Sequence, residues 1–244
     1  TAVFPNTDIK GGVAITYHDN FKTFESIGIF TAFPELNEIV KKARAVNENK
    51  SIASMIYTQV KFDLDALYAD YPEYKSILGS KGKDRRFRNN IFEKVALFTD
   101  EKKDEDDLRI LGILKNKRTW KYISRKYVDM SHENLKLWKV LVPRANGSGA
   151  LGEVLSTPLI GEPLIGEPLI GYTQSFIGIG SFHTELEANA LLQYVKSKFA
   201  RVLLGVLKVT QDNDSGVWKL IPLQDYTSNS DIDWSKSIHE IDLQ

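Results

Sequence analysis

The chain has 244 residues and a formal net charge of zero; 42% of its residues are hydrophobic and 26% are charged, as in an ordinary globular protein with a substantial core. It contains no cysteine, which excludes disulfides and thiolate metal sites and fits a cytoplasmic location, and its four histidines are scattered singly. No run of about 18 apolar residues occurs and no signal peptide is recognisable, so we expect no membrane partner.

The zero net charge conceals a strong asymmetry along the chain. Residues 108–150 contain ten Lys or Arg against two acidic residues, a local charge of +8, whereas residues 151–244 contain six against twelve, a local charge of −6. A middle third this basic indicates a positive surface of the kind that binds nucleic acid. The alternative is an ordinary solvated face of lysines.

The first thirty residues have the pattern of a β-hairpin or meander. Strands are expected over 13–17 and 24–30, on either side of a turn at Asp19 and Asn20. A helix is predicted over 34–46, because it begins with a proline, carries acidic residues in its first turns and ends with basic residues.

Residues 54–62 alternate like a strand, and residues 63–71 have the pattern of a short helix. Residues 85–88 then place three arginines around Phe87. This pattern suits phosphate binding combined with base stacking, and equally suits one exposed face of a strand.

A basic hairpin is predicted in the middle of the chain. The charged run 100–107 should be a solvated loop, and strands over 108–114 and 119–123 follow it, joined by the basic turn 115–118. A hairpin tip with three cations can enter a DNA groove or lie over its backbone. The candidates for phosphate contact are Lys115, Lys117, Arg118, Lys121, Arg125 and Lys126.

The stretch WKVLVPRANGSG, residues 138–149, follows a predicted short helix over 131–137. It begins as a buried strand at 140–142, stops at Pro143 and opens into a polar, basic loop with two glycines. Arginine pairs with guanine, asparagine with adenine and serine with either, so the loop suits the reading of base edges. Its candidates are Arg144, Asn146 and Ser148. The alternative is an ordinary turn at the end of a strand.

Residues 158–171 are an internal repeat, PLIGE, PLIGE, PLIG, which we interpret as a loop or edge ribbon; a ridge for self-association is the alternative. A strand is predicted over 175–182. One long core helix should then run from a capping box at Thr184 and Glu187 to about Leu204. A strand over 218–223 and a polar tail over 227–244 complete the chain.

Two enzyme motifs are only partly present. Gly178 and Gly180 resemble half of a nucleotide-binding fingerprint, but its third glycine would fall at His183. The acids at 63, 65 and 70, followed by Glu73 and Lys75, loosely match the acid and lysine pattern of metal-dependent nucleases. A metal-dependent DNA endonuclease using Asp63 or Asp70, Glu73 and Lys75 is therefore an alternative function.

Five stretches, taken in order, resemble the C-terminal portion of adenine-specific DNA methyltransferases of type II restriction–modification systems, including fused restriction and methylation enzymes. They are FPNTDIKGGVAITY, WKYISRKYV, NLKLWKVLVPRANGSG, SFIGIGSFHTELEANALLQYVKSKFARVLLGVLKVTQDN and VWKLIPLQDYT. The resemblance covers nearly the whole chain. It implies that residues 1–31 are the terminal strands of a catalytic domain and that residues 32–244 are a DNA target-recognition domain with a repeat loop at 158–171.

The resemblance implies sequence-specific recognition of double-stranded DNA, by which an adenine is placed for a methyl-transfer or cleavage module elsewhere. The methyl-donor glycine motif and the Asn-Pro-Pro motif are absent here, so no cofactor and no catalytic residue are expected in this chain, and S-adenosylmethionine is expected in the parent enzyme. The expected partners are double-stranded DNA and the catalytic methyltransferase domain of the same polypeptide. Gln211 is a further candidate for base contact, and Lys208 and Lys219 for backbone contact.

The expected fold is α+β (mixed α/β), with antiparallel hairpins and a long core helix. A protein-interaction domain that assembles through the repeat is the remaining alternative.

Overall fold

The computed structural model describes residues 16–23, 29, 31, 33–47, 50–79, 85–145, 162–208, 210–237 and 240, and it has the mixed α+β fold that the sequence predicts. The elements follow one another as α1 (Pro34–Asn47), the 3-10 helix η1 (Ile52–Met55), β1 (Ile56–Tyr57), α2 (Leu64–Asp70), α3 (Tyr74–Leu78), α4 (Ile91–Lys94), β2 (Leu108–Leu114), β3 (Lys117–Ile123), η3 (Arg125–Tyr127), β4 (Trp138–Pro143), β5 (Leu164–Gly166), β6 (Ile170–Tyr172), β7 (Phe176–Phe182), α5 (Glu185–Lys196), α6 (Lys198–Leu207) and η4 (Ser215–Trp218). None of the described helices is long and apolar enough to cross a membrane.

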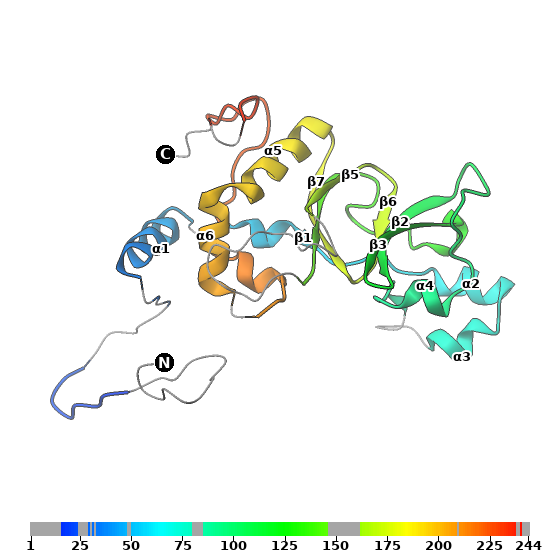
Figure 1. Cartoon of the computed structure of the whole chain (residues 1–244), viewed down its shortest axis with the longest axis horizontal. Coiled ribbons are helices and arrows are strands. Elements are labelled where there is room, and N and C mark those ends of the chain that lie inside the picture. The colour runs from blue at the N-terminus through cyan, green and yellow to red at the C-terminus, as the bar shows by residue number, and fades with distance from the viewer. Residues whose placement is uncertain are drawn as a thin grey trace.

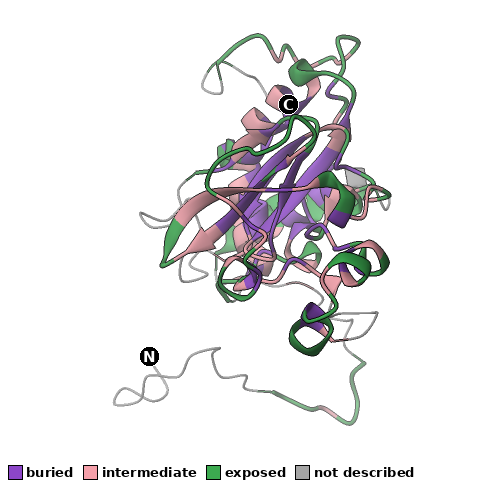
Figure 2. Ribbon diagram, turned by 90° about the vertical axis from the view of Figure 1, so that its right-hand side faces the viewer, coloured by how far each residue is buried: buried purple, intermediate pink, exposed green. Residues whose placement is uncertain are grey.

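Two sheets form the centre of the molecule (Figure 1). The larger sheet has the strand order β1-β7-β4-β5, and all its neighbouring strands are antiparallel. The smaller has the order β3-β2-β6, in which β2 is antiparallel to β3 and parallel to β6. Helices α5 and α6 lie on one side of the sheets and α2, α3 and α4 on the other. In Figure 2 the strands are the most buried part of the chain.

The alternation of side chains along each strand explains these layers. Along β4, Val140 and Val142 pack into the core beneath α5 and α6, while Leu141 packs into a small cluster between the two sheets. Along β2, Ile110 packs against α2 to α4, and Leu111 joins the cluster between the sheets. Because consecutive residues point to opposite faces, a strand buried on both faces has a continuous apolar sequence.

The predicted long core helix is two helices. The capping box of Thr184 and Glu187 begins α5 as expected, but the chain becomes extended at Ser197, which caps the end of α5 and the start of α6. The Ser197 hydroxyl accepts a hydrogen bond from the Ala200 N–H at 3.1 Å. Serine favours such caps because its hydroxyl replaces a missing backbone partner. Both helices bury residues in the same core, so the apolar pattern continues across the break.

A buried lysine lies where β4 meets the repeat. The Lys139 side chain is fully buried, and its Nζ donates to the carbonyl oxygens of Asn134 (2.9 Å), Leu135 (3.3 Å), Leu137 (2.9 Å) and Glu167 (3.1 Å). Burial lowers the pKa of Lys139 to about 7. Lys139 therefore contributes nothing to the positive surface counted from the sequence.

The predicted helix over 131–137 is wrong. The structure has turns there: Leu137 N–H donates to Asn134 C=O at 3.3 Å, and three carbonyl groups of the segment accept hydrogen bonds from the Lys139 ammonium. The predicted strand over 218–223 is also wrong. That segment begins at the end of η4, and its apolar residues are buried without a strand: Ile221 C=O accepts from Ile52 N–H at 3.0 Å. The predicted strand over 54–62 is reduced to β1 and isolated bridges at Lys61 and Phe62.

The second and third copies of the repeat are edge strands, as predicted, but of different sheets. Strand β5 pairs with β4, and β6 pairs with β2. A Cβ at Gly166 would lie 3.0 Å from Lys139 Cγ, and one at Gly171 would lie 2.6 Å from Ile110 Cδ1, so both glycines allow close packing. Residues 158–161 lie outside the described residues.

Most of the predicted N-terminal strands also lie outside the described residues. The turn between them is present, since Asp19 Oδ1 accepts a hydrogen bond from Phe21 N–H at 2.9 Å. Helix α1 confirms the predicted helix and buries Val40 and Ala43 in the core beneath α5 and α6. The boundary between a catalytic-domain stub over 1–31 and a recognition domain over 32–244 stays a prediction.

Candidate nucleic-acid interface

The basic hairpin has the predicted strands and a tighter tip. Lys115 and Asn116 form a two-residue turn, with φ of 48° and 60°, between Leu114 and its partner Lys117. Positive φ at both positions matches the twist of a hairpin, and asparagine tolerates this conformation better than most residues. Lys115 and Lys117 are exposed at this tip, whereas Arg118 lies within β3 and not in the turn.

Backbone hydrogen bonds bring the hairpin, the end of β4 and the turn between β6 and β7 together. The Thr173 N–H donates to Leu111 C=O at 2.9 Å, which fixes the turn to β2. The Arg144 N–H donates to Ser175 C=O at 2.9 Å, which fixes the residue after β4 to the same turn. The basic tip and the start of the predicted base-reading loop therefore lie at one end of the two sheets.

The segment after α6 joins them. Ala145 forms an antiparallel bridge with Asp212, and the Asn213 N–H donates to Arg144 C=O at 2.6 Å. The buried Asn213 side chain donates through Nδ2 to Pro143 C=O at 2.8 Å. Gln211, predicted to contact bases, is exposed beside this bridge.

These segments enclose a pocket of about 240 Å³. Its lining residues come from five places in the sequence: Asn89, Ile113, Arg144, Ala145, Gln174, Ser175 and Asp212. The side chains of Asn89, Arg144, Gln174 and Asp212 make no hydrogen bond or ion pair within the described part of the chain. Sequence reasoning found Arg144 and missed the other three, because no local pattern marks them.

Two of the residues predicted to contact phosphate interact with other parts of the protein. Arg118 Nη2 donates to Glu162 C=O at 2.6 Å, its guanidinium lies over the Phe176 ring, and burial lowers its pKa. Lys121 Nζ lies 2.6 Å from Asp100 Oδ1, and its side chain is only 12% exposed. Both side chains join β3 to neighbouring segments, so they would have to leave these partners to make the phosphate contacts that stay predicted for them.

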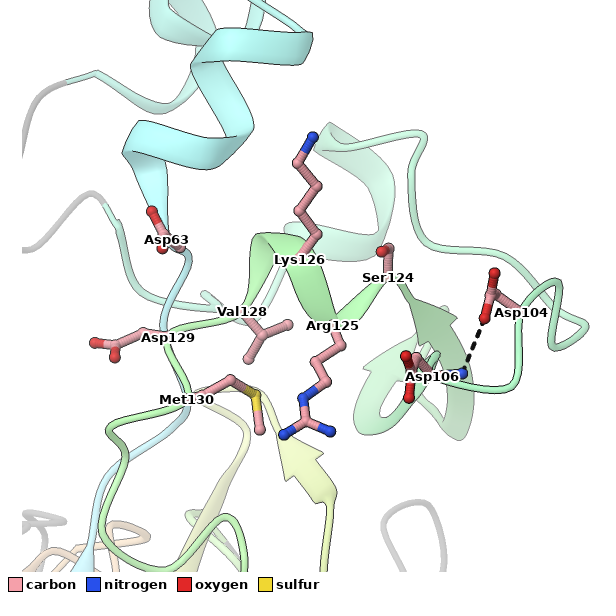
Figure 3. Close-up of a pocket in the computed structure, with 9 residues that line it drawn as sticks. All are labelled: Asp63, Asp104, Asp106, Ser124, Arg125, Lys126, Val128, Asp129 and Met130. Atoms are coloured by element: carbon pink, nitrogen blue, oxygen red, sulfur yellow. Dashed lines mark hydrogen bonds between the residues drawn. The ribbon is translucent and has the colours of Figure 1, made fainter.

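Arg125 and Lys126 lie beyond the far end of β3, about 20 Å from the tip at roughly 3.3 Å per residue. They line a second pocket, of about 490 Å³, shown in Figure 3. Its lining residues are Asp63, Asp104, Asp106, Ser124, Arg125, Lys126, Val128, Asp129 and Met130. Four carboxylates outnumber two cations there, which disfavours phosphate binding. Arg125 and Lys126 therefore lie apart from the lysines of the hairpin tip.

Lys126 is also paired outside that pocket. Its Nζ lies 2.5 Å from Asp70 Oδ2, and the Tyr127 hydroxyl donates to the same oxygen at 2.8 Å. The hydrogen bond from Lys126, followed by that from Tyr127, lowers the pKa of Asp70, and the Asp70 carboxylate raises the pKa of Tyr127.

The acids of the nuclease alternative have structural roles. Asp63 caps α2, accepting from the Ala66 N–H at 3.1 Å, and Asp70 is paired as just described. Glu73 is the residue before α3, and Lys75 is exposed on that helix. Among the described residues, no three His, Cys, Asp or Glu side chains gather in an arrangement that could hold a metal.

The remaining residues predicted to contact DNA differ in their exposure. Lys208 is 7% exposed at the end of α6, which disfavours its predicted contact with the DNA backbone, whereas Lys219 is exposed. Asn146 and Ser148 lie outside the described residues. Phe87, between the three arginines, is fully buried and cannot stack on a base.

The two glycines in β7, Gly178 and Gly180, do not have the arrangement of a binding loop for a nucleotide or a methyl donor. A Cβ at Gly178 would lie 2.4 Å from Tyr172 Oη, and Gly180 has a φ of +85° within the strand. Both glycines allow strand packing and form no loop around a ligand.

No protein-family model, curated protein or solved structure matches this chain. The family resemblance stated for the sequence therefore stays a prediction. The function proposed below is supported by that resemblance and by the arrangement of side chains around the hairpin tip.

Proposed function

We propose that this chain is a sequence-specific module for recognition of double-stranded DNA, of the target-recognition type found in adenine-specific type II restriction–modification enzymes. The observation that carries the proposal is the pocket next to the hairpin tip. Exposed Lys115 and Lys117 stand beside a pocket whose arginine, carboxylate and amide side chains are unpaired within the described residues. Candidate groups for phosphate binding and for base reading thus lie at one end of the two sheets, which supports the proposal.

The dimensions of a hairpin support this assignment. The major groove of B-DNA admits a two-stranded β-ribbon, and a tight two-residue turn makes β2 and β3 a narrow one. In this arrangement the two tip lysines bind phosphates and set the register. Arg144 and Gln211 then lie within reach of base edges.

The proposed role is recognition without catalysis by this chain. Methyl transfer or cleavage would be carried out by a catalytic domain of the same polypeptide, to which S-adenosylmethionine would belong, and the location would be cytoplasmic. Assembly through the repeat receives less support, because the second and third copies are integrated into the two sheets.

Selection of duplexes from a random pool by the 244-residue chain, with heparin as competitor, tests the proposal. We expect a defined sequence to emerge, bound at least about a thousandfold more tightly than unrelated duplexes. Lys115→Ala and Lys117→Ala should weaken binding to all duplexes alike, and the exposed but distant Lys75→Ala serves as the matched control. Equal affinity for all duplexes and for heparin would refute the proposed function.

A further inference from the structure

The pocket beside the hairpin tip contains both a cation and a carboxylate. Arg144 and Asp212 line it together, yet no ion pair joins them. A phosphate group placed in the pocket would gain from the arginine and be repelled by the aspartate. A base edge is neutral and presents hydrogen-bond donors and acceptors side by side, so it suits this pair of groups better.

The backbone at both residues is fixed although their side chains are unpaired. Arg144 is held through its N–H by Ser175 and through its C=O by Asn213, and Asp212 is held by its bridge with Ala145. Burial of the Asn213 side chain, which is 0% exposed, anchors this bridge to the core. A fixed backbone with unpaired polar side chains favours recognition, because binding then costs little further conformational entropy in the protein.

The chemistry of the two groups selects one base pair. In the major groove, guanine presents N7 and O6 as two acceptors, which match the fork of an arginine, and its partner cytosine presents an N4 donor, which matches a carboxylate. An A·T pair would place the adenine N6 donor against the arginine. Resting on the function proposed above, we propose that Arg144 and Asp212 together read one G·C base pair in the major groove, Arg144 at guanine and Asp212 at cytosine.

The test uses the duplex selected by the 244-residue chain. Each guanine is replaced in turn by 7-deazaguanine, which lacks the N7 acceptor but keeps Watson–Crick pairing. We expect one position at which this change weakens binding by the unmodified chain about tenfold or more. At that position Arg144→Gln should be insensitive to 7-deazaguanine and should shift the preference toward adenine, because glutamine matches adenine N6 and N7.

Two further variants complete the design. Asp212→Ala should relax discrimination at the same base pair, because it removes the acceptor for cytosine. The matched control Lys117→Ala should weaken all duplexes alike and keep full sensitivity to 7-deazaguanine.

The possible outcomes distinguish failure of the G·C assignment from failure of the proposed DNA recognition. If a defined site is bound but 7-deazaguanine weakens binding at no guanine, or if Arg144→Gln weakens all duplexes by one factor, the G·C assignment fails and DNA recognition stands. If no duplex is preferred, both fail. The substituted guanine lies in the DNA, so the result with the unmodified chain does not depend on whether a variant folds.

Discussion

The ammonium of Lys139 and the backbone carbonyl of Glu167 are joined by a hydrogen bond of 3.1 Å, although 28 residues separate them in the chain. The same ammonium binds three carbonyl oxygens of the segment before β4. One buried cation thus joins β4, the preceding turns and the second copy of the repeat. Among the described residues no carboxylate contacts this ammonium, and the carbonyl dipoles there compensate for its burial.

Replacing this lysine should therefore be costly. Lys139→Met keeps the aliphatic stem but leaves four carbonyl oxygens without their donor, and we expect a loss of about 2–4 kcal/mol in the free energy of unfolding. The measurement is urea unfolding followed by circular dichroism. Lys136→Met, at an exposed position nearby, should change stability by less than about 0.5 kcal/mol. Equal midpoints for the two variants would show that the carbonyl oxygens find other partners.

Stability should also depend on pH through Lys139. Its pKa is about 7 in the folded chain and 10.5 in the unfolded chain, so between these values the unfolded state binds more protons. The free energy of unfolding should therefore rise as the pH increases from about 7, by up to about 1.4 kcal/mol per pH unit. Unfolding of the wild type and of Lys139→Met between pH 7 and pH 9.5 measures this, and only the wild type should show the rise. If the free energies of unfolding of the two proteins change with pH in parallel, the four carbonyl oxygens offset the cost of burying the Lys139 ammonium.

The hairpin tip should tolerate few residues at position 116. Asn116 has a φ of 60°, so Asn116→Val should destabilise the chain by about 1–2 kcal/mol, because a β-branched side chain clashes in this conformation. Asn116→Gly should be neutral or slightly stabilising. Thermal unfolding compares the two. Similar losses for both would indicate that the side chain of Asn116, and not its backbone conformation, matters.

The salt dependence of DNA binding should be modest. Two exposed tip lysines predict a slope of about −2 for log K against log salt, at about 0.9 per phosphate contact. The eight cations that the sequence suggests for phosphate or backbone contact would have given about −7. Fluorescence anisotropy over a range of salt concentrations distinguishes the two values, and the steeper one would mean that Arg118, Lys121 or Lys126 leaves its partner in the complex.

Gly178→Ala should damage the contact between the two sheets. The added methyl would lie 2.4 Å from Tyr172 Oη, which donates a hydrogen bond to Asn134 Oδ1 at 3.3 Å, and 2.6 Å from Asn134 Nδ2. We expect a loss of about 1–3 kcal/mol, measured by urea unfolding. Gly216→Ala, whose methyl would meet only the exposed Asp214 side chain at 3.0 Å, is the matched control.

The sequence predicted those elements whose causes are local. The β2–β3 hairpin, β4, β7, α1 and the capping box at Thr184 each depend on neighbouring residues, and all are present. The break at Ser197 was missed because α5 and α6 bury residues in one core, so the periodicity shows no interruption. The buried state of Lys139 was missed because one of its acceptors, Glu167, is distant in the chain.

The candidate site was predicted only in part for the same reason. Lys115, Lys117 and Arg144 could be chosen from local patterns, and the structure places them at one end of the sheets. Asn89, Gln174 and Asp212 join them through backbone bonds between distant segments, which no local pattern reveals. Conversely, Arg118 and Lys121 have ordinary surface patterns, but long-range contacts with Glu162 and Asp100 occupy them.

The placement of the repeat in two sheets bears on how this chain can vary in length. Because the two complete copies are identical, losing either one leaves the same shortened sequence, with PLIGE still available for β5 and PLIG for β6. Thr157 would then stand where Glu162 now pairs with Lys196, so this exposed ion pair would be lost. Replication slippage within the gene could therefore add or remove five-residue units in the segment before β5, without altering either sheet. Each unit corresponds to up to about 17 Å of extended chain.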